Sequence, residues 1–241
     1  MLTHAPALVI FDKDGTLIDF QHMWGQWAHA FAIRLSQALG HDVYLQVATA
    51  YAFDASSGYI DPRGPLAIAT MATMQQMAVL IVAPYCASQA AALQLVQHAW
   101  QPPDPTREAQ PLADLVALFT AIRSHGVAIA IATADNRAPT VATMQHLGLA
   151  SMIDAFACAD DVGVAAKPAP DKIYAICRQL RIQPADCIMI GDTPADMQMG
   201  RNAGVMARIG VTSGLSTATD LHADASWIMP SVGHLFAYWP A

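Results

Sequence analysis

Residues 8–17 read Leu-Val-Ile-Phe-Asp-Lys-Asp-Gly-Thr-Leu, an apolar, strand-forming run that ends in two carboxylates. Side chains two positions apart in a strand point the same way, so Asp12 and Asp14 are predicted to project together where the strand stops. Like charges this close repel unless a divalent cation or a shared proton compensates them. Gly15 lets the chain turn sharply after them, because it has no Cβ. The stretch therefore indicates a site for chemistry on an anionic substrate, with a metal as partner.

The composition limits what such a site can serve. The chain has 241 residues, 54% apolar and 13% charged, which favours a folded protein with one large domain or two small ones. Its net charge of −7 argues against nucleic acid as a partner, while a local cation can still bind a small phosphorylated metabolite. The four cysteines form no CxxC pair, and the chain starts without a secretory signal pattern. We expect a cytoplasmic protein with free thiols.

One long stretch, residues 64–103, contains no Asp, Glu, Lys or Arg. Its part 65–83 is long enough to span a bilayer. Polar side chains such as Thr73 and Gln75 interrupt that part and Pro84 ends it, so we expect helices of a subdomain and no membrane partner. The outer face of the stretch is a candidate interface for a homodimer.

Helical patterns dominate after the first strand, predicted at residues 7–11, and no strand pattern competes up to Trp100. Glycine and proline breaks separate the predicted helices, which span 22–39, 43–53, 66–82 and 88–100. A polar, proline-rich linker follows at 101–111.

The rest of the chain alternates between short strands and helices. The predicted strands span 127–132, 155–158, 187–190, 205–209 and 225–229. The predicted helices span 112–124, 136–146, 170–181, 194–203 and 232–239. This rhythm predicts an α/β fold, with a Rossmann-like, three-layer core whose parallel sheet is covered on both faces. We assign residues 1–19 and 107–241 to this core, and residues 20–106 to an inserted all-helical domain.

Polar groups follow each predicted core strand, where ligands of parallel sheets bind. Thr133 and Ala134 come after the second core strand and offer a hydroxyl and backbone N–H groups for an anion. Lys167 is a lone cation before a proline, and Asp192 and Asp196 form a second acidic pair after the strand at 187–190. These are the kinds of group that phosphoryl transfer needs.

The roles of these groups fit one reaction. Asp12 can attack phosphorus as the nucleophile, and Asp14 can protonate the leaving oxygen and then take a proton from the attacking water. Mg²⁺ bound by Asp12 and Asp192 would cancel carboxylate and phosphate charge. Thr133 and Lys167 would bind the remaining phosphate oxygens.

Four motifs in this order are similar to those of the haloacid dehalogenase-like hydrolase superfamily, and they resemble most closely its phosphoglycolate phosphatase-like branch. They are Asp12-Lys-Asp-Gly-Thr-Leu17, Thr133, Lys167-Pro168 and Gly191-Asp-Thr-Pro-Ala-Asp196. The resemblance spans residues 7 to about 210, and the helical insertion resembles the helical cap of that family.

The resemblance implies a Mg²⁺-dependent phosphatase that hydrolyses a small phosphomonoester, phosphoglycolate-like or a sugar phosphate. It implies that Asp12 forms an aspartyl-phosphate and that Asp14 is the acid and base and also offers its carbonyl to Mg²⁺. Asp192 is then a direct metal ligand, and Asp196 supports the metal site.

Two other functions stay open on the same fold. A β-phosphoglucomutase-like phosphosugar mutase keeps both aspartates and a similar cap, although Thr16 fits the phosphatases better. A catalytically silent binding protein is the third reading. Asp14 itself argues against a dehalogenase, because that group lacks the second aspartate.

Several residues carry two interpretations each. Arg63, in a tight turn of the insertion, is either a solvated loop residue or a contact for a substrate carboxylate or second phosphate. Asp196 either complements the helix dipole or supports the metal. We expect Asp135 to cap the helix at 136, and Trp24 and Trp27 to pack in the core more than to contact substrate.

Overall fold

The computed structural model describes residues 4–54, 56–237 and 239. Positions 1–3, 55, 238 and 240–241, which the predicted ranges include, lie outside these described residues. At the centre is a six-stranded sheet with the order β5-β4-β1-β6-β7-β8, and every pair of neighbours is parallel. Its strands are β1 (Leu8–Phe11), β4 (Ala128–Ala132), β5 (Ala155–Ala157), β6 (Cys187–Gly191), β7 (Ala207–Val211) and β8 (Trp227–Met229). The predicted parallel α/β core is confirmed.

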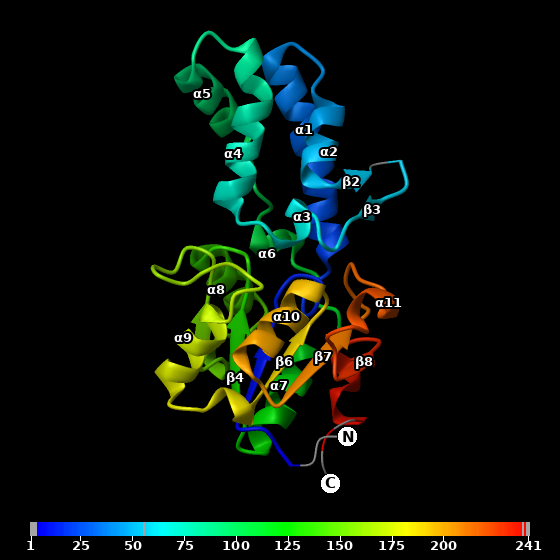
Figure 1. Cartoon of the computed structure of the whole chain (residues 1–241), viewed down its shortest axis with the longest axis vertical. Helices are drawn as coiled ribbons and strands as arrows, with labels where there is room; N and C mark the ends of the chain where they lie inside the picture. The colour runs from blue at the N-terminus through cyan, green and yellow to red at the C-terminus, as the bar shows by residue number, and fades with distance from the viewer. Residues whose placement is uncertain (1–3, 55, 238, 240–241) are drawn as a thin grey trace.

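Helices connect these strands and lie around the sheet (Figure 1). They are α7 (Leu115–Ser124), α8 (Arg137–His146), α9 (Asp171–Leu180), α10 (Pro194–Ala203) and α11 (Ala218–Leu221). A 3₁₀-helix, Val232–Ala237, stands where a last α-helix was predicted, and β7 begins two residues later than predicted. The shift of β7 follows from the end of α10, where Gly204 at φ +73° caps the helix and Val205 and Met206 serve as the connection.

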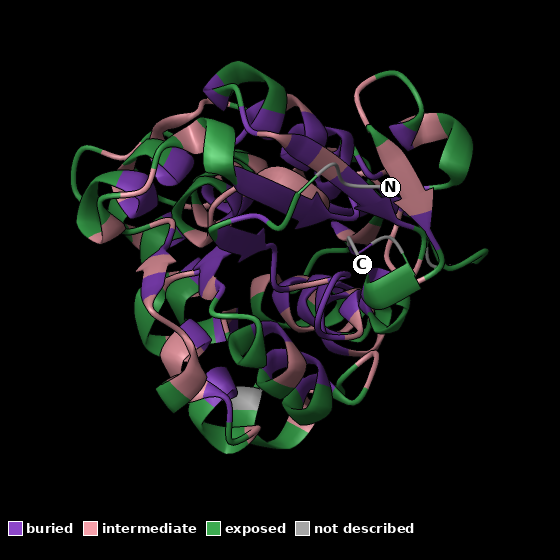
Figure 2. Ribbon diagram, turned by 90° about the horizontal axis from the view of Figure 1, so that it is seen from below, coloured by how far each residue is buried: buried purple, intermediate pink, exposed green. Residues whose placement is uncertain are grey.

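Strand alternation explains why both faces of the sheet are covered. Val9 and Phe11 belong to one buried cluster with α7, where the rings of Phe11 and Phe119 stack with their centres 5.4 Å apart. Leu8 and Ile10 point the other way, into a second buried cluster with residues of α9 and α10. Figure 2 shows the strands as a buried layer between helices. An apolar run without alternation is what a strand buried on both faces requires.

The position of β1 determines where the carboxyl edge of the sheet gathers its polar residues. β1 lies between β4 and β6, and Phe11 is paired with Ile131 and with Ile190. All three strands therefore end at the same level. The residues that follow them, beginning with Asp12, share one edge.

A lobe of helices stands above this edge in Figure 1; we call residues 21–99 the helical lobe. Its helices are a π-helical turn (Gln21–Gly25), α1 (Gln26–Leu39), α2 (Tyr44–Tyr51), α3 (Pro65–Ile68), α4 (Met71–Val82) and α5 (Gln89–Ala99). A single turn, α6 (Pro105–Glu108), lies in the proline-rich linker. The exact boundaries of two domains stay a prediction.

The prediction of one continuous helix over 66–82 is wrong, because the helix is interrupted between α3 and α4. Ala69 and Thr70 are extended, with Thr70 at φ −72° and ψ 156°. The Thr70 side chain accepts a hydrogen bond from the Thr73 backbone N–H at 3.2 Å and so caps α4. A threonine hydroxyl that satisfies a free N–H competes with continuation of the helix. The break brings the start of α4 over the carboxyl edge of the sheet.

The expectation that no strand lies between residues 22 and 100 is also wrong. A two-stranded antiparallel hairpin joins β2 (Phe53–Asp54) to β3 (Tyr59–Ile60). Asp54 accepts hydrogen bonds from the Ser56 N–H at 2.9 Å and from the Ser57 hydroxyl at 2.9 Å, which holds the turn. Each strand has only two residues, too few to show a strand period.

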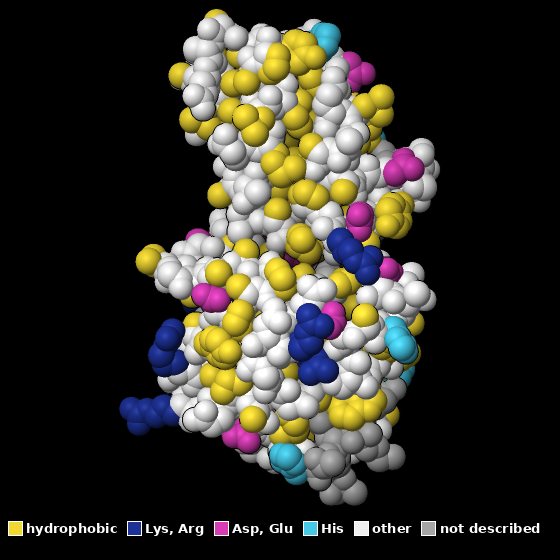
Figure 3. All heavy atoms as spheres, viewed as in Figure 1, with side chains coloured by type: hydrophobic (Ala, Val, Ile, Leu, Met, Phe, Trp, Pro, Cys, Tyr) yellow, Lys and Arg dark blue, Asp and Glu magenta, His cyan; other side chains and the backbone are white. Residues whose placement is uncertain are grey.

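The charge-free stretch gives no membrane span: within the described part of the chain, every helix is too short or too polar to cross a bilayer. On the face shown in Figure 3, the helical lobe carries mostly hydrophobic and uncharged side chains. Leu80 and Leu93 are exposed on α4 and α5. A homodimer through this face stays a prediction.

The capping of α4 makes a testable prediction. Thr70→Ala removes the acceptor for the Thr73 N–H, so we expect it to lower the free energy of unfolding by about 1 kcal/mol. Thr70→Ser keeps the hydroxyl and is the matched control. Urea denaturation followed by circular dichroism measures both; equal stability of the two variants would contradict the role of this cap.

Candidate active site

The carboxyl ends of β1 and β4 and the loop before α9 surround one narrow cavity. Its volume is about 40 Å³, and Asp12, Asp14, Thr133, Ala134 and Lys167 are among its lining residues. The structure thus brings together five predicted site residues that are up to 155 positions apart in the chain.

Lys167 joins Asp12, which follows β1, to Asp196 in the first turn of α10. Its Nζ lies 2.7 Å from Asp12 Oδ1 and 2.6 Å from Asp196 Oδ1. All three side chains are buried. The ammonium therefore compensates two carboxylates at once in a region from which water is largely excluded, where such a pair is strong.

Asp192 is fully buried and completes an acidic cluster. Asp12, Asp192 and Asp196 each offer an oxygen within 4.8 Å of the others. Asp192 accepts hydrogen bonds from the Thr16 hydroxyl at 3.2 Å and from the Leu215 N–H at 3.0 Å. The backbone packs closely around it, because a Cβ on Gly15 would lie 2.3 Å from Asp192 Oδ2.

Asp196 caps a helix and also lies in the acidic cluster, and its support of a metal stays a prediction. Its Oδ2 accepts hydrogen bonds from the hydroxyl of Thr193 at 2.6 Å and from the Thr193 N–H at 3.1 Å, which makes a capping box at the start of α10. Its other oxygen faces Lys167 in the acidic cluster. A helix cap and a charged site thus share one side chain.

Negative charge exceeds positive charge in this cluster. Burial raises the pKa of Asp12 to about 7, against the opposing effect of Lys167. Burial raises the pKa of Asp192 well above its usual range, and the nearby carboxylates of Asp12 and Asp196 raise it further. A bound cation would reverse these shifts, because it favours the charged forms.

The residues present fit a hard divalent cation. All three groups of the cluster are carboxylates, which are ligands that small divalent cations prefer. Asp14 Oδ1, which is also buried in this region, has no hydrogen-bond partner among the described residues. The carboxylate ligands, the excess of negative charge and the unpaired Asp14 Oδ1 all favour a bound divalent cation.

Lys13 is a site residue that the sequence analysis missed. It is fully buried, and its Nζ lies 2.6 Å from Asp135 Oδ2 and 3.2 Å from Asp14 Oδ2. Burial alone lowers the pKa of Lys13, but Asp14 and Asp135 raise it above the usual range. A lysine between two motif aspartates at the end of an apolar strand was the available signal, because a buried charge must be paired.

The predicted cap of α8 by Asp135 is wrong. Asn136 is the N-terminal flanking residue of α8 and its own side chain makes no cap, whereas Asp160 accepts a hydrogen bond from the Arg137 N–H at 2.8 Å. The Asp135 carboxylate accepts a hydrogen bond from the Asn136 N–H at 2.7 Å and pairs with Lys13. An ion pair across 122 positions replaced the local cap, because Lys13 has no water to solvate its charge.

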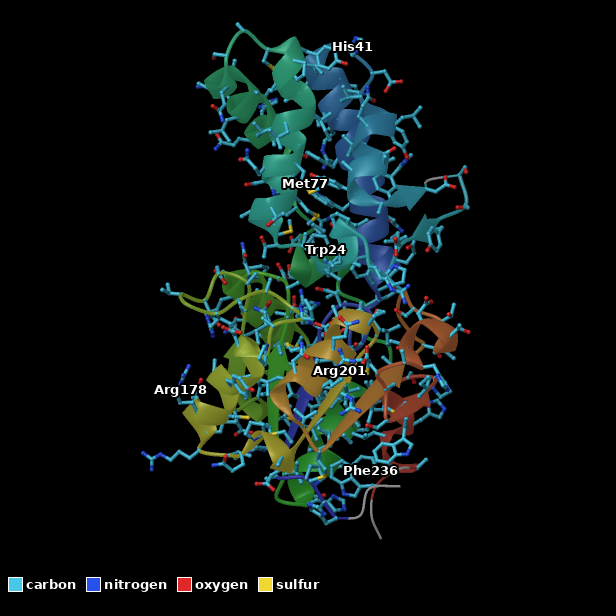
Figure 4. All side chains as sticks on the ribbon, viewed as in Figure 1. Trp24, His41, Met77, Arg178, Arg201 and Phe236 are labelled. Carbon is cyan, nitrogen blue, oxygen red and sulfur yellow. The ribbon has the colours of Figure 1, made fainter. Side chains whose placement is uncertain are left out.

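The helical lobe lines one side of the cavity, and that side is apolar. The lining residues on this side are Phe20, just before the lobe, and Trp24, Leu66, Ala67, Ala69, Met71 and Met74 of the lobe. Most of them come from α3, from α4 and from the break between these helices. Figure 4 places Trp24 at the junction of the lobe and the sheet. Trp24 is buried, as predicted, but it also lines the cavity.

Arg63 lies apart from the residues that line this cavity. Its guanidinium pairs with Asp220 at 3.2 Å, and 59% of its side chain is exposed. The pair connects the helical lobe to α11. A contact between Arg63 and substrate stays a prediction.

Comparison with known proteins agrees with this geometry. The family model described as haloacid dehalogenase-like hydrolase matches residues 6–204. Human N-acylneuraminate-9-phosphatase is 50% identical over 44 residues, which are 18% of each chain. The phosphoglycolate phosphatase of Rhodospirillum rubrum is 29% identical over 103 residues, covering 43% of this chain and 42% of that protein. The matched regions thus span less than half the length of these two relatives.

Solved structures show the same fold. A crystal structure described as a predicted phosphoglycolate phosphatase from Haemophilus somnus 129PT superposes with a TM-score of 0.68 at 14% identity. The superposition covers 96% of this chain and 97% of that one. The likeness includes the helical lobe as well as the sheet.

The buried position of Lys13 makes a testable prediction. Lys13→Met leaves Asp14 and Asp135 without their counter-charge, so we expect it to lower the free energy of unfolding by about 3–5 kcal/mol. Arg123→Met is the control, because its ion pair with Asp154 is exposed and is worth about 1 kcal/mol or less.

The loss of stability in Lys13→Met should depend on pH. Burial raises the pKa of Asp14, so without Lys13 the folded state takes up a proton more readily than the unfolded state. Stability of the variant should therefore rise as pH falls, and the deficit should be smaller at pH 5 than at pH 8. Urea denaturation at both pH values measures it; a deficit no larger than that of Arg123→Met would contradict the prediction.

Proposed function

The chain belongs to the haloacid dehalogenase-like hydrolase family, and on that premise we propose that it is a Mg²⁺-dependent phosphatase of small phosphomonoesters, phosphoglycolate-like or sugar phosphates. The observation that carries the proposal is the set of Asp12, Asp14, Lys167 and Asp192 at one edge of the sheet, beneath apolar residues of the helical lobe. Asp14 is partly buried and the other three are buried. Both relatives named above are phosphatases, which supports the same class of reaction.

Asp12 is the nucleophile. One of its oxygens pairs with Lys167, which favours the ionised form and orients the carboxylate. The other oxygen attacks phosphorus: an Asp12–phosphorus bond forms while the ester bond from phosphorus to the alcohol oxygen breaks. Asp14 gives its proton to the departing alcohol.

Asp14 is suited to hold and return that proton. Burial raises its pKa, while Lys13 opposes the rise and fixes the carboxylate in place. In the second step Asp14 takes a proton from water as the water attacks phosphorus. The Asp12–phosphorus bond breaks, inorganic phosphate leaves, and both aspartates return to their starting forms.

Thr133 and the backbone of Ala134 bind phosphate oxygens. The Thr133 hydroxyl accepts a hydrogen bond from the Asp135 N–H at 3.1 Å, so its own proton is free to donate. Lys167 lines the same cavity and supplies positive charge there. These donors are already in place before the reaction, which is how such sites stabilise charge that develops on phosphate.

Asp12 and Asp192 would hold Mg²⁺, with Asp196 as support and the Asp14 carbonyl as a further ligand. When bound, the ion offsets the charge of the carboxylates and of the phosphate. The remaining coordination falls to water and substrate, as is usual for Mg²⁺.

The nucleophile makes a testable prediction. Asp12→Asn should lower phosphate release from a panel of phosphate esters by at least about a thousandfold, because the amide is a poor nucleophile. Asp186→Asn, an exposed aspartate just before β6, is the matched control and should keep its activity.

Product analysis separates the alternatives. A phosphatase releases inorganic phosphate, a phosphosugar mutase returns an isomeric sugar phosphate, and a silent binding protein does neither. Activity of Asp12→Asn close to that of the unaltered chain would contradict the assignment of the nucleophile.

The metal site makes a second prediction, with a readout that needs no substrate. Millimolar Mg²⁺ should raise the melting temperature of the unaltered chain, because it binds only the folded state. Asp192→Asn should lose most of this shift, whereas Asp186→Asn should keep it. EDTA should abolish phosphate release, and Mg²⁺ should restore it. An equal melting shift in both variants would exclude Asp192 as a ligand.

A further inference from the structure

A second, larger cavity opens beside the narrow one. Its volume is about 400 Å³, within the usual range for small-molecule sites. Trp24, Met71 and Asp135 line both cavities, so the two are neighbours. The narrow cavity, at about 40 Å³, has room for about three water molecules. If it holds the phosphoryl group, the alcohol part of the ester needs further space, and the larger cavity lies next to it.

The larger cavity has aromatic walls that are held in place. Trp24 and Trp100 line it, and both contact Trp27 edge-on, with ring centres 5.7 Å and 4.9 Å apart. The Trp27 indole N–H donates a hydrogen bond to the Gln101 carbonyl at 2.8 Å. Fixed aromatic faces bind apolar surfaces at a low cost in side-chain entropy. Further apolar lining comes from Met23, Met71, Pro102 and Pro103.

The cations that line the two cavities are already paired with aspartates. Among the described residues that line them, the cations are Lys13 and Lys167. Lys13 is fully buried and is paired with Asp14 and Asp135. Lys167 faces the phosphoryl position and two aspartates of its own. A second anionic group on the substrate would therefore lie beside Asp135 with no free partner.

The polar groups that stay available in the larger cavity are uncharged. Gln75 and Asn136 line it and carry side-chain amides. Amides both donate and accept, so they suit hydroxyl or amide groups of a ligand.

We propose that the alcohol part of the substrate is uncharged and lays an apolar face, such as one side of a ring, against Trp24 and Trp100. A hydroxyl or amide of the same part bonds to Gln75 or Asn136. This inference rests on the proposed phosphatase function and narrows it: esters with a carboxylate or a second phosphate are poor substrates, and neutral ring alcohols are good ones.

Two matched pairs of esters test the inference. Benzyl phosphate is compared with phosphoglycolate, and fructose 6-phosphate with fructose 1,6-bisphosphate, with phosphate release measured in the presence of Mg²⁺. We expect kcat/KM for the uncharged member of each pair to be higher by at least about tenfold. The ratio of benzyl phosphate to fructose 6-phosphate then tells whether the apolar face belongs to an aromatic ring or to a sugar.

A gain of function tests the position of the alcohol part. Gln75→Arg places a cation in the wall of the larger cavity and should raise kcat/KM for phosphoglycolate relative to benzyl phosphate by about tenfold, mainly through KM. Gln76→Arg is the control, because Gln76 is exposed and lies outside the residues that line either cavity. It should leave the ratio unchanged.

Each other outcome has one meaning. A preference of the unaltered chain for phosphoglycolate or the bisphosphate overturns the inference and leaves the phosphatase function standing. Equal effects of the two arginine variants also overturn it. If phosphate is released neither from the four esters nor from a generic ester such as p-nitrophenyl phosphate, the phosphatase function itself is overturned. If Gln75→Arg fails to fold, the two ratios of the unaltered chain decide.

Discussion

Burying carboxylates without enough positive charge is the constraint on which the rest of this structure depends. Two buried lysines each lie between two aspartates, Lys13 between Asp14 and Asp135 and Lys167 between Asp12 and Asp196. Asp192, fully buried, accepts hydrogen bonds from Thr16 and Leu215 but lies close to two further carboxylates, Asp12 and Asp196. Removing charges from water costs several kcal/mol for each ion even after relaxation, so this set is stable only when its members are held in good geometry. The remaining negative charge is what a divalent cation would offset.

The sheet provides that geometry. β1 sits between β4 and β6, and its last residue pairs with residues near the ends of both, so side chains from distant parts of the chain meet at one edge. Close packing around Asp192 and the capping box at Thr193 hold the acidic groups in place. Rigid placement matters here because catalysis of phosphoryl transfer comes mostly from position and charge.

The helical lobe contributes apolar surface and few charged groups to the site. Its residues above the site are apolar, which excludes water and strengthens the electrostatic interactions beneath them. The same surface continues into the aromatic walls of the larger cavity. In the proposed function, the edge of the sheet carries the groups for the reaction, and Trp24 and Gln75 of the lobe contribute to selection of the alcohol. Arg63, the one cation that the sequence offered for selection, pairs with Asp220, and its contact with substrate stays a prediction.

The sequence by itself determined the order of strands and helices in the core and the residues at the strand ends. Those features depend on short periods of hydrophobicity and on neighbours within a few positions, as at Asp12, Asp14, Asp192 and Asp196. The sequence did not predict the interrupted helix at Thr70 or the two-residue strands at Phe53 and Tyr59, because the sequence patterns of such short features are too short to recognise. Only the tertiary structure decided that Lys13 pairs with Asp135 and that Trp24 lines the site. Partners so far apart in the chain are selected by packing and by the need to neutralise buried charge, and no local pattern carries that information.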